Sequence, residues 1–352
     1  MNGKNQDNRS RHKFKRVFSK SRAKIIGGGL ALILGATAIA TPKKPCPEYF
    51  MPWNEAPRTA VQEWTEHCFL NLNNNAGVEV ISMPSLVETD NIEARGDVKD
   101  FSAHLNLPLR KPSECGDQFL PGLIIVGGNI STKGDWFDNG LWVGRYQVDY
   151  PKAGIGLRFS GYSEPLICQK GLTQSAWFVD VIGLLSRMNA NGEYGGCIIP
   201  PQYKEGKGFE IGAGLASINS SSLFGVRGSY RSLEYIAELG NNQEELYKEF
   251  RKTYGVEGFL TNGLVELSGI YLGNLVGIAG EPTHKEGYLD LVASLFPDNG
   301  EIGFGLGIRK YESEQPVALG VLQFKGRNGA YVRTSITPKG NWMLRFEVPL
   351  DG

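Results

Sequence analysis

The sequence predicts an all-β fold, an antiparallel meander closed as an outer-membrane β-barrel, with one or two short helices. Large apolar residues alternate with small or polar ones in segments such as 209–215, 289–295, 302–309 and 342–348. Successive side chains of a strand point to opposite faces, so this alternation is typical of strands with one apolar face. Asn-Gly dipeptides lie between such segments, as in residues 327–329, and supply the positive φ of tight hairpins.

Glycine supplies the third observation, and it favours a barrel over a soluble sandwich. The chain has 46 glycines, about 13 % of its residues, against an ordinary usage of roughly 7 %. Many alternate with large apolar residues inside the predicted strands, where glycine weakens a soluble sheet. A lipid-facing exterior around a narrow interior gives this pattern, and we expect roughly 10–14 strands. The alternative is a soluble exported β-sandwich that acts as an adhesin or a carbohydrate-binding module.

Aromatic residues near the predicted strand ends fit the girdle that a membrane barrel places at the lipid–water interface. We assign to it Tyr230, Tyr235, Tyr254, Tyr271, Tyr288, Tyr311, Tyr331 and Trp342. Ordinary packing is the alternative for any such aromatic stripe.

The N-terminus predicts export by a signal peptide, residues 1–40. The first 24 residues carry nine Lys or Arg against one acid, and an apolar run from Ile25 to Ala40 ends in Ala38-Ile39-Ala40. A basic region, an apolar region and an Ala-x-Ala site together indicate cleavage after Ala40. The alternative is an uncleaved anchor, but sixteen helical residues reach only about 24 Å, short of the ~30 Å hydrocarbon core.

Charge and cysteine content narrow the function classes. Removing residues 1–40 takes nine basic and one acidic residue from a chain that has 37 of each, which leaves a net charge near −8. An acidic exported protein is a poor candidate for binding nucleic acid. Disulfides form outside the cytoplasm, so one candidate pair is Cys168 with Cys197. A second disulfide would join two of Cys46, Cys68 and Cys115.

The domain plan has a short periplasmic segment, residues 41–75, before the barrel, residues 76–352. Residues 58–70 predict a helix, because Val61, Trp64 and Cys68 recur at helical spacing. Two stretches inside the barrel also favour helices: residues 173–188, and residues 242–255 with their capping-box pattern. Turns are expected at residues 91–96, and a loop at Pro200-Pro201.

A search for catalytic and metal-binding patterns predicts none, and no cofactor. His67-Cys68 is better explained by a buried or disulfide-bonded cysteine, and Asp135 with Asp138 by a solvated turn, because their spacing matches no EF-hand loop. Cys-x-x-Cys spacing is absent, so zinc is not expected. A barrel hydrolase acting on lipid or polysaccharide stays as an alternative, with His104 or His284 paired to a serine.

Four segments together resemble a known family. Residues 80–85 (Val-Ile-Ser-Met-Pro-Ser) are followed by Gly96, and residues 222–239 hold a Phe-Gly strand and its hairpin return. Residues 254–259 and 270–278 would pair next, the second with a Tyr-x-x-Gly-Asn turn. These segments resemble the YjbH-type family of exopolysaccharide-biosynthesis outer-membrane barrels. The resemblance implies an outer-membrane accessory protein in exopolysaccharide or capsule assembly or export. Its partners would be outer-membrane lipid, polysaccharide and other export components.

Overall fold

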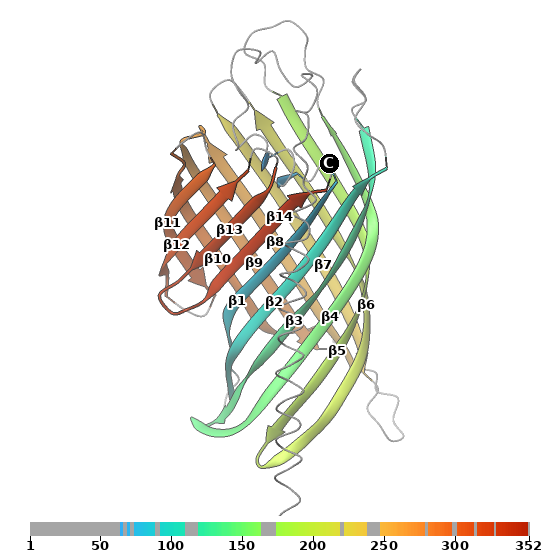
Figure 1. Ribbon diagram of the computed structural model, residues 1–352. Coiled ribbons are helices and arrows are strands. Elements are labelled where there is room, and N and C mark those ends of the chain that lie inside the picture. The colour runs from blue at the N-terminus through green and yellow to red at the C-terminus, as the bar shows by residue number, and fades with distance from the viewer. Residues whose placement is uncertain are drawn as a thin grey trace, which may run out of the picture. The chain divides into compact units, whose positions relative to one another are not determined.

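Consecutive hairpins give each strand an antiparallel neighbour, and the first and last strands pair with each other. The computed structural model describes residues 64–65, 69–70, 74–88, 92–109, 119–162, 174–218, 222–237, 247–278, 281–297, 301–312, 315–326 and 329–350. Within them, fourteen strands form one closed barrel in sequence order (Figure 1). The strands are β1 (Asn75–Glu88), β2 (Ile92–Pro108), β3 (Phe119–Asp138), β4 (Leu141–Tyr162), β5 (Gln174–Tyr194), β6 (Cys197–Ile218), β7 (Leu223–Ala237), β8 (Tyr247–Thr261), β9 (Val265–Ile278), β10 (Glu281–Leu295), β11 (Ile302–Tyr311), β12 (Val317–Lys325), β13 (Tyr331–Ile336) and β14 (Trp342–Pro349).

Closure of the sheet confirms the predicted fold class and excludes the β-sandwich. β1 joins β14 over seven residues, from Asn75 opposite Pro349 to Ile81 opposite Met343. We call the end where β1 begins and β14 ends the terminal end (upper in Figure 1) and the opposite end the hairpin end. Turns at the hairpin end show the expected chemistry, since Asn139 and Gly140 have φ of +47° and +79°. The described residues hold no helix long and apolar enough to span a membrane.

The barrel wall is much taller on one side than on the other. β3 to β6 have 20, 22, 21 and 22 residues, whereas β11 to β14 have 10, 9, 6 and 8. Beyond Ile81, β1 pairs only with β2, and before Gly206, β6 pairs only with β5. The hairpin-end parts of β1 to β6 therefore form an open six-stranded extension, which we call the projecting sheet. It consists of residues 82–88, 92–99, 131–138, 141–149, 189–194 and 197–203.

Prolines lie on both free edges of the projecting sheet. Pro84 is on the unpaired side of β1, and Pro200 and Pro201 are in the part of β6 that no strand covers. The predicted loop at Pro200-Pro201 is therefore wrong. Proline lacks the N–H that a ladder needs, so it is confined to edge strands, where it also prevents pairing with another chain.

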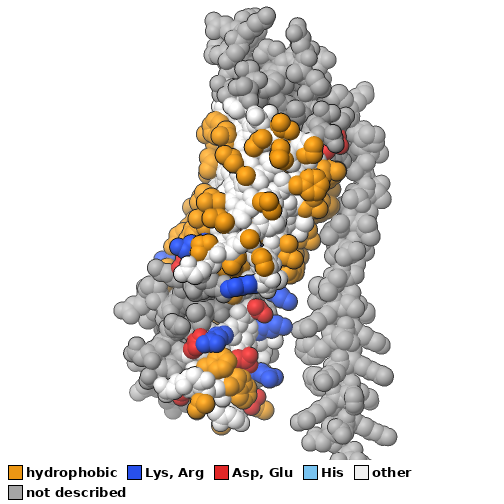
Figure 2. Space-filling view, turned by 90° about the vertical axis from the view of Figure 1, so that its left-hand side faces the viewer, with side chains coloured by type: hydrophobic (Ala, Val, Ile, Leu, Met, Phe, Trp, Pro, Cys, Tyr) orange, Lys and Arg blue, Asp and Glu red, His pale blue; other side chains and the backbone are white. Residues whose placement is uncertain are grey.

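The outer face carries an apolar band that ends where the projecting sheet begins. Exposed apolar side chains such as Ile155, Leu185, Leu267 and Leu306 lie on β4, β5, β9 and β11. Figure 2 shows hydrophobic side chains gathered on one side of the barrel. Directly beyond this band, outward residues on β2 to β6 are polar or charged: Lys99, Asp97, Ser131, Lys133, Asp149, Gln147, Arg187, Asn189, Lys207 and Glu205. Within the described part of these strands, exposed apolar residues occur again only at the hairpin-end tips of β4 to β6: Leu141, Trp142, Tyr194 and Ile198. An apolar belt around a closed barrel is the surface that a lipid bilayer requires.

The aromatic girdle is only partly the predicted one. Tyr230, Tyr254 and Tyr271 lie on the outward faces of β7, β8 and β9, and the Tyr230 and Tyr254 rings are 5.4 Å apart. Tyr235, Tyr288, Tyr311 and Tyr331, in contrast, are at most 2 % exposed and point into the barrel. At the terminal end a second aromatic group consists of Phe119, Phe159 and Trp177. The sequence could not separate the two faces, because aromatic residues occur on both.

Both helices predicted inside the barrel are wrong over the described residues. Residues 174–188 belong to β5, and residues 247–255 belong to β8. In β5, Leu184 is 2 % exposed and faces the interior, whereas the adjacent Leu185 is 71 % exposed on the band. Apolar residues on both faces hide the two-residue period, and this mimics a helical stripe. The turn expected at residues 91–96 is shorter, because β2 already begins at Ile92.

Candidate functional site

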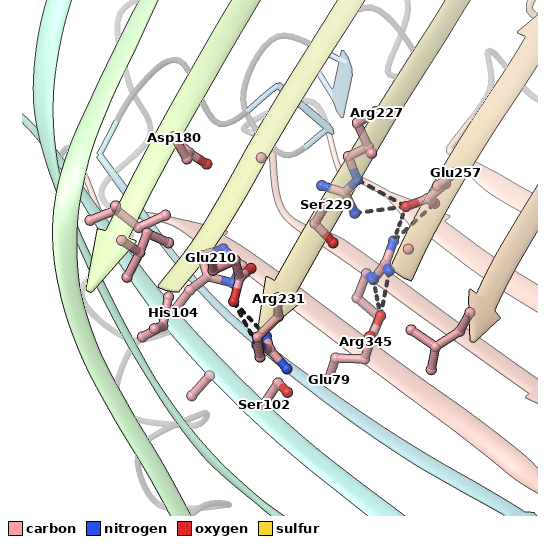
Figure 3. A pocket seen from close by; sticks show the side chains of 18 of the residues that line it. Glu79, Ser102, His104, Asp180, Glu210, Arg227, Ser229, Arg231, Glu257 and Arg345 are labelled. Atoms are coloured by element: carbon pink, nitrogen blue, oxygen red, sulfur yellow. Dashed lines mark hydrogen bonds and ion pairs between the residues drawn. The ribbon is translucent and has the colours of Figure 1, made fainter. Parts of the chain in front are cut away.

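Inward-facing charged residues surround a cavity of about 230 Å³ inside the barrel, which we call the lumen chamber (Figure 3). They come from β1, β2, β4 to β8 and β14, so closure of the sheet is what brings them together. The polar residues in its lining include Glu79, Ser102, His104, Lys152, Arg158, Asp180, Glu210, Arg227, Ser229, Arg231, Glu257, Arg345 and Glu347.

Glu257 of β8 ties opposite walls of the barrel together. Its carboxylate accepts hydrogen bonds from Arg227 of β7 at 2.7 Å and from Arg345 of β14 at 2.7 Å. β8 and β14 are not neighbours in the sheet, so the second bond crosses the lumen. Arg345 also donates to Glu79 of β1 at 2.6 Å. These groups bridge the space that a pore would leave open (Figure 3).

Further ion pairs are withdrawn from solvent inside the barrel. Arg309 donates to both carboxylate oxygens of Asp290 at 2.7 Å, and both residues are fully buried. Arg158 pairs with Asp180, and Lys325 pairs with Glu266. Because their charges are desolvated, removal of one partner leaves a buried, unpaired charge. This typically lowers the free energy of unfolding by about 3–5 kcal/mol.

An apolar layer closes the barrel interior at the base of the projecting sheet. Its buried side chains belong to one contiguous cluster and include Met83, Val98, Ile130, Tyr150, Met188, Leu233 and Tyr235. Tyr235 also shares a hydrogen bond of 2.8 Å with Ser186. Ile124 and Ile182 belong to the same cluster and line the lumen chamber, so the layer separates the chamber from the hairpin end.

Four buried residues that precede β1 lie next to the chamber on its terminal-end side, where the chamber residues Arg158 and Arg227 donate to two of them. Trp64, Thr65, Phe69 and Leu70 are at most 3 % exposed, and Leu70 N–H donates to the Thr65 carbonyl at 3.0 Å. We call these four residues the inserted turn. Their cluster partners are strand residues near the terminal end: Ala176, Phe178, Ala216, Leu223, Phe259 and Tyr331. Trp64 and Thr65 have helical conformation, but the other positions of the predicted helix except Phe69 and Leu70 lie outside the described residues, so the helix stays a prediction. Insertion of the four residues into the barrel left no sequence signal beyond the apolar spacing.

His104, the histidine whose side chain the structure describes, lies beside a carboxylate rather than a serine. His104 Nε2 lies 3.0 Å from Glu347 Oε2, and a Cβ on Gly77 would lie only 2.3 Å from His104 Cε1. Ser102 Oγ donates to Asp100 at 3.1 Å and accepts from Lys152 at 3.2 Å. His284 lies in β10 opposite Val276 of β9, and only its backbone is described. The histidine that is described therefore has a carboxylate, and not a serine, as its neighbour at Nε2.

A second hollow, of about 880 Å³, lies in the projecting sheet, and we call it the polar groove. It is lined by Arg95, Gly96, Asp97, Lys133, Gly134, Asp135, Arg145, Tyr146, Gln147, Asn191, Gly192, Glu193 and Ile198. Trp142 Nε1 donates to Asp135 at 3.0 Å, and the Arg145 guanidinium lies 5.7 Å from the centre of the Trp142 ring. Trp136 and Tyr146 pack with their rings 5.0 Å apart. The groove thus combines aromatic rings with exposed donors and acceptors.

The structure also bears on the predicted disulfides and metal sites. Cys197 is an exposed free thiol at the hairpin-end start of β6, and the other four cysteines lie outside the described residues. β5 spans about 66 Å at a rise of ~3.3 Å per residue. The six residues from Cys168 to Gln174 reach about 20 Å at most, which argues against a Cys168–Cys197 disulfide. The pairings among Cys46, Cys68 and Cys115 stay predictions, as does cleavage after Ala40. No group of three metal-ligating side chains occurs among the residues that the structure describes.

Comparisons with known proteins report only a similarity of fold. No protein-family model and no curated protein matches the chain. Among solved structures, the transport unit of the autotransporter AIDA-I from Escherichia coli has 10 % identity and a TM-score of 0.39, over 82 % of this chain and 95 % of that one. The translocator domain of the autotransporter NalP from Neisseria meningitidis has 11 % identity and a TM-score of 0.35, over 78 % and 87 %. Acinetobacter baumannii OccAB2 has 8 % identity and a TM-score of 0.26, over 79 % and 97 %.

The class of the protein follows from its own structure. A closed antiparallel barrel combines an apolar outer band, aromatic residues at both margins and a charged interior. This combination defines a transmembrane β-barrel of the outer-membrane type.

Proposed function

We propose that this protein has a non-enzymatic accessory role in the assembly or export of a surface polysaccharide, and that it acts through the polar groove rather than through an open pore. The observation that carries the proposal is the contrast between its two polar regions. Inside the barrel, charged groups such as Glu257 and Arg345 pair with each other across the lumen, whereas the groove presents its polar groups outside the apolar band. The resemblance of residues 80–85 and 222–239 to the YjbH-type family supports the choice of polysaccharide.

The chemistry of the groove suits a carbohydrate chain. Sugars offer hydroxyl groups to planar carboxylate, amide and guanidinium groups, and offer C–H faces to aromatic rings. The groove supplies Asp135, Arg145 and Gln147 for the hydroxyls, with Trp142 beside Asp135. Three basic and three acidic residues in its lining nearly cancel, so recognition would rest on hydrogen bonds rather than on net charge.

The proposed orientation places the hairpin end outside the cell. Outer-membrane barrels carry their longer excursions on the extracellular side, and the projecting sheet is the longest excursion that the structure describes. The groove would then meet polysaccharide after it has crossed the membrane, and the terminal end would face the periplasm.

Cell fractionation followed by gel mobility with and without boiling tests the location. We expect the protein in the outer-membrane fraction, with a band that shifts on heating because a folded barrel resists detergent. A periplasmic or secreted band that does not shift would overturn the outer-membrane assignment.

Secretion of polysaccharide by a deletion strain tests the role of the groove. Complementation with the native gene should restore secretion, whereas a Trp142→Ala, Arg145→Ala double variant should restore much less. Lys207→Ala is the matched control, because Lys207 is exposed on the same outer surface but outside the groove. Equal secretion from a folded double variant and the control would show that the groove has no such role.

A further inference from the structure

The inserted turn is held mainly through its backbone carbonyls on the polar side. Arg227 Nη1 donates to the Phe69 carbonyl at 3.1 Å, and Arg158 Nη1 donates to the Leu70 carbonyl at 3.3 Å. A carbonyl oxygen is present in every residue, so these two arginines recognise a peptide backbone rather than a particular side chain.

Each of these arginines has a second partner in the barrel wall. Arg227 also bonds to Glu257, and Arg158 also bonds to Asp180. The guanidinium groups would therefore stay oriented if the inserted turn left, and only one donor of each would turn to water. The two arginine donors are therefore held in place by the barrel wall and do not depend on the inserted turn.

Aromatic groups make the apolar half of the contact. The Trp64 ring lies 4.9 Å from the Phe259 ring and 5.0 Å from the Tyr331 ring. Lys325 Nζ lies 4.0 Å from the centre of the Trp64 ring, and Phe69 packs edge-on against Phe259 at 4.8 Å. A cation and two aromatic rings around an indole form a specific receptor for an aromatic side chain.

We propose that the terminal-end mouth of the barrel is a binding site for a short peptide segment with an aromatic side chain. The inserted turn is its resident ligand, and its displacement opens the lumen chamber to solvent at the terminal end. The apolar layer stays in place in that state, so the chamber becomes a vestibule and not a pore. This proposal does not depend on the role of the polar groove.

Thiol labelling of the chamber tests the proposal in the full-length chain. Ser229 is exposed within the chamber and contacts neither arginine nor the inserted turn in the described structure, so Ser229→Cys reports access. The five native cysteines are replaced by serine, and a small maleimide is added to detergent-solubilised protein. The combined Trp64→Ala, Phe69→Ala change should speed labelling of residue 229 by about tenfold or more, because the open state becomes populated.

A synthetic peptide tests whether the mouth is a binding site. The probe is the sequence of residues 61–72 with Cys68→Ser, added to the Trp64→Ala, Phe69→Ala protein. We expect it to restore slow labelling at residue 229, while the same peptide with both aromatic residues replaced by alanine does not. A separate control variant keeps Cys197 as its single cysteine. Its labelling should be unchanged throughout, because this thiol lies on the projecting sheet.

Three outcomes would overturn the proposal. They are equal labelling with and without the aromatic residues of the inserted turn, failure of the peptide to protect, and channel conductance in planar bilayers after the turn is altered. If the double variant loses its heat-dependent gel shift, Phe69→Ala alone is labelled instead, and an unchanged rate in that folded variant overturns the proposal equally.

Discussion

The lumen and the projecting sheet use the same residue types in opposite ways. In the lumen, Arg309 and Asp290 are fully buried and held at 2.7 Å. On the projecting sheet, Arg145 and Asp135 lie 3.4 Å apart, with side chains 75 % and 46 % exposed. Because the Arg309–Asp290 pair is desolvated, the loss of either partner would leave a buried, unpaired charge and destabilise the fold. Water and salt screen the exposed Arg145–Asp135 pair, which therefore contributes little to stability. The comparison teaches that the buried charged pairs in the lumen stabilise the barrel, whereas the exposed charged groups on the projecting sheet remain available to bind a ligand.

The largest expected effect comes from breaking the bond across the lumen. Glu257→Gln removes the buried charge that the Arg227 and Arg345 guanidinium groups share, and it should lower the free energy of unfolding by about 3–5 kcal/mol. The temperature at which the folded gel band is lost measures the change. Asp135→Asn, in the polar groove, is the control and should leave that temperature nearly unchanged. If both variants melted alike, the distinction between the two regions would fail.

An intermediate effect distinguishes lipid from water outside the barrel. Leu306 is 79 % exposed on the apolar band and Ile198 is 83 % exposed on the projecting sheet, so exposure alone would treat them equally. Leu306→Arg should destabilise the protein in lipid vesicles by up to about 2–4 kcal/mol, because a charge enters the hydrocarbon.

Ile198→Arg is the matched control for this measurement, and it should change stability by no more than about 0.5 kcal/mol. Urea titration of both variants in vesicles measures the difference. A cost at Ile198 as large as that at Leu306 would place the projecting sheet in the bilayer as well.

The smallest expected effect concerns the exposed pair itself. Arg145→Ala should change the free energy of unfolding by less than about 1 kcal/mol, because exposed ion pairs contribute little. Raising the salt concentration should further reduce this difference while leaving the effect of Glu257→Gln almost intact. Parallel unfolding curves at low and high salt measure both. If salt strongly reduced the change in free energy of unfolding caused by Glu257→Gln, water and ions would have access to the charged groups of the lumen.

The two-residue period identified many strands, but it failed where both faces are apolar. It succeeded in β11, where exposed Phe304 and Leu306 alternate with inward glycines. It failed in β5, because the interior beside Leu184 is as apolar as the lipid beside Leu185. In the same way Pro200-Pro201 suggested a loop, since nothing local shows that β6 is an edge strand at that point.

The candidate sites could not be predicted from local sequence patterns, because each site combines residues from strands that are distant in the sequence. Glu257 and Arg345 are 88 residues apart in the sequence, and only closure of the barrel brings them to 2.7 Å. The polar groove likewise needs the register of β2 to β6, which places Asp97, Lys133 and Gln147 on adjacent strands. Charged residues on the small, polar face of a strand were the available signal, as at Arg309 among the glycines of β11.

The sequence by itself determined the all-β class, the barrel and an upper bound of fourteen strands that the structure reaches, because alternation and turn chemistry are local properties. The tertiary structure alone decided which face of each strand meets lipid. It also decided that buried charges pair across the lumen and that Trp64, Thr65, Phe69 and Leu70 lie inside the barrel. These features depend on contacts between residues distant in the chain, whose positions are fixed only when the sheet closes.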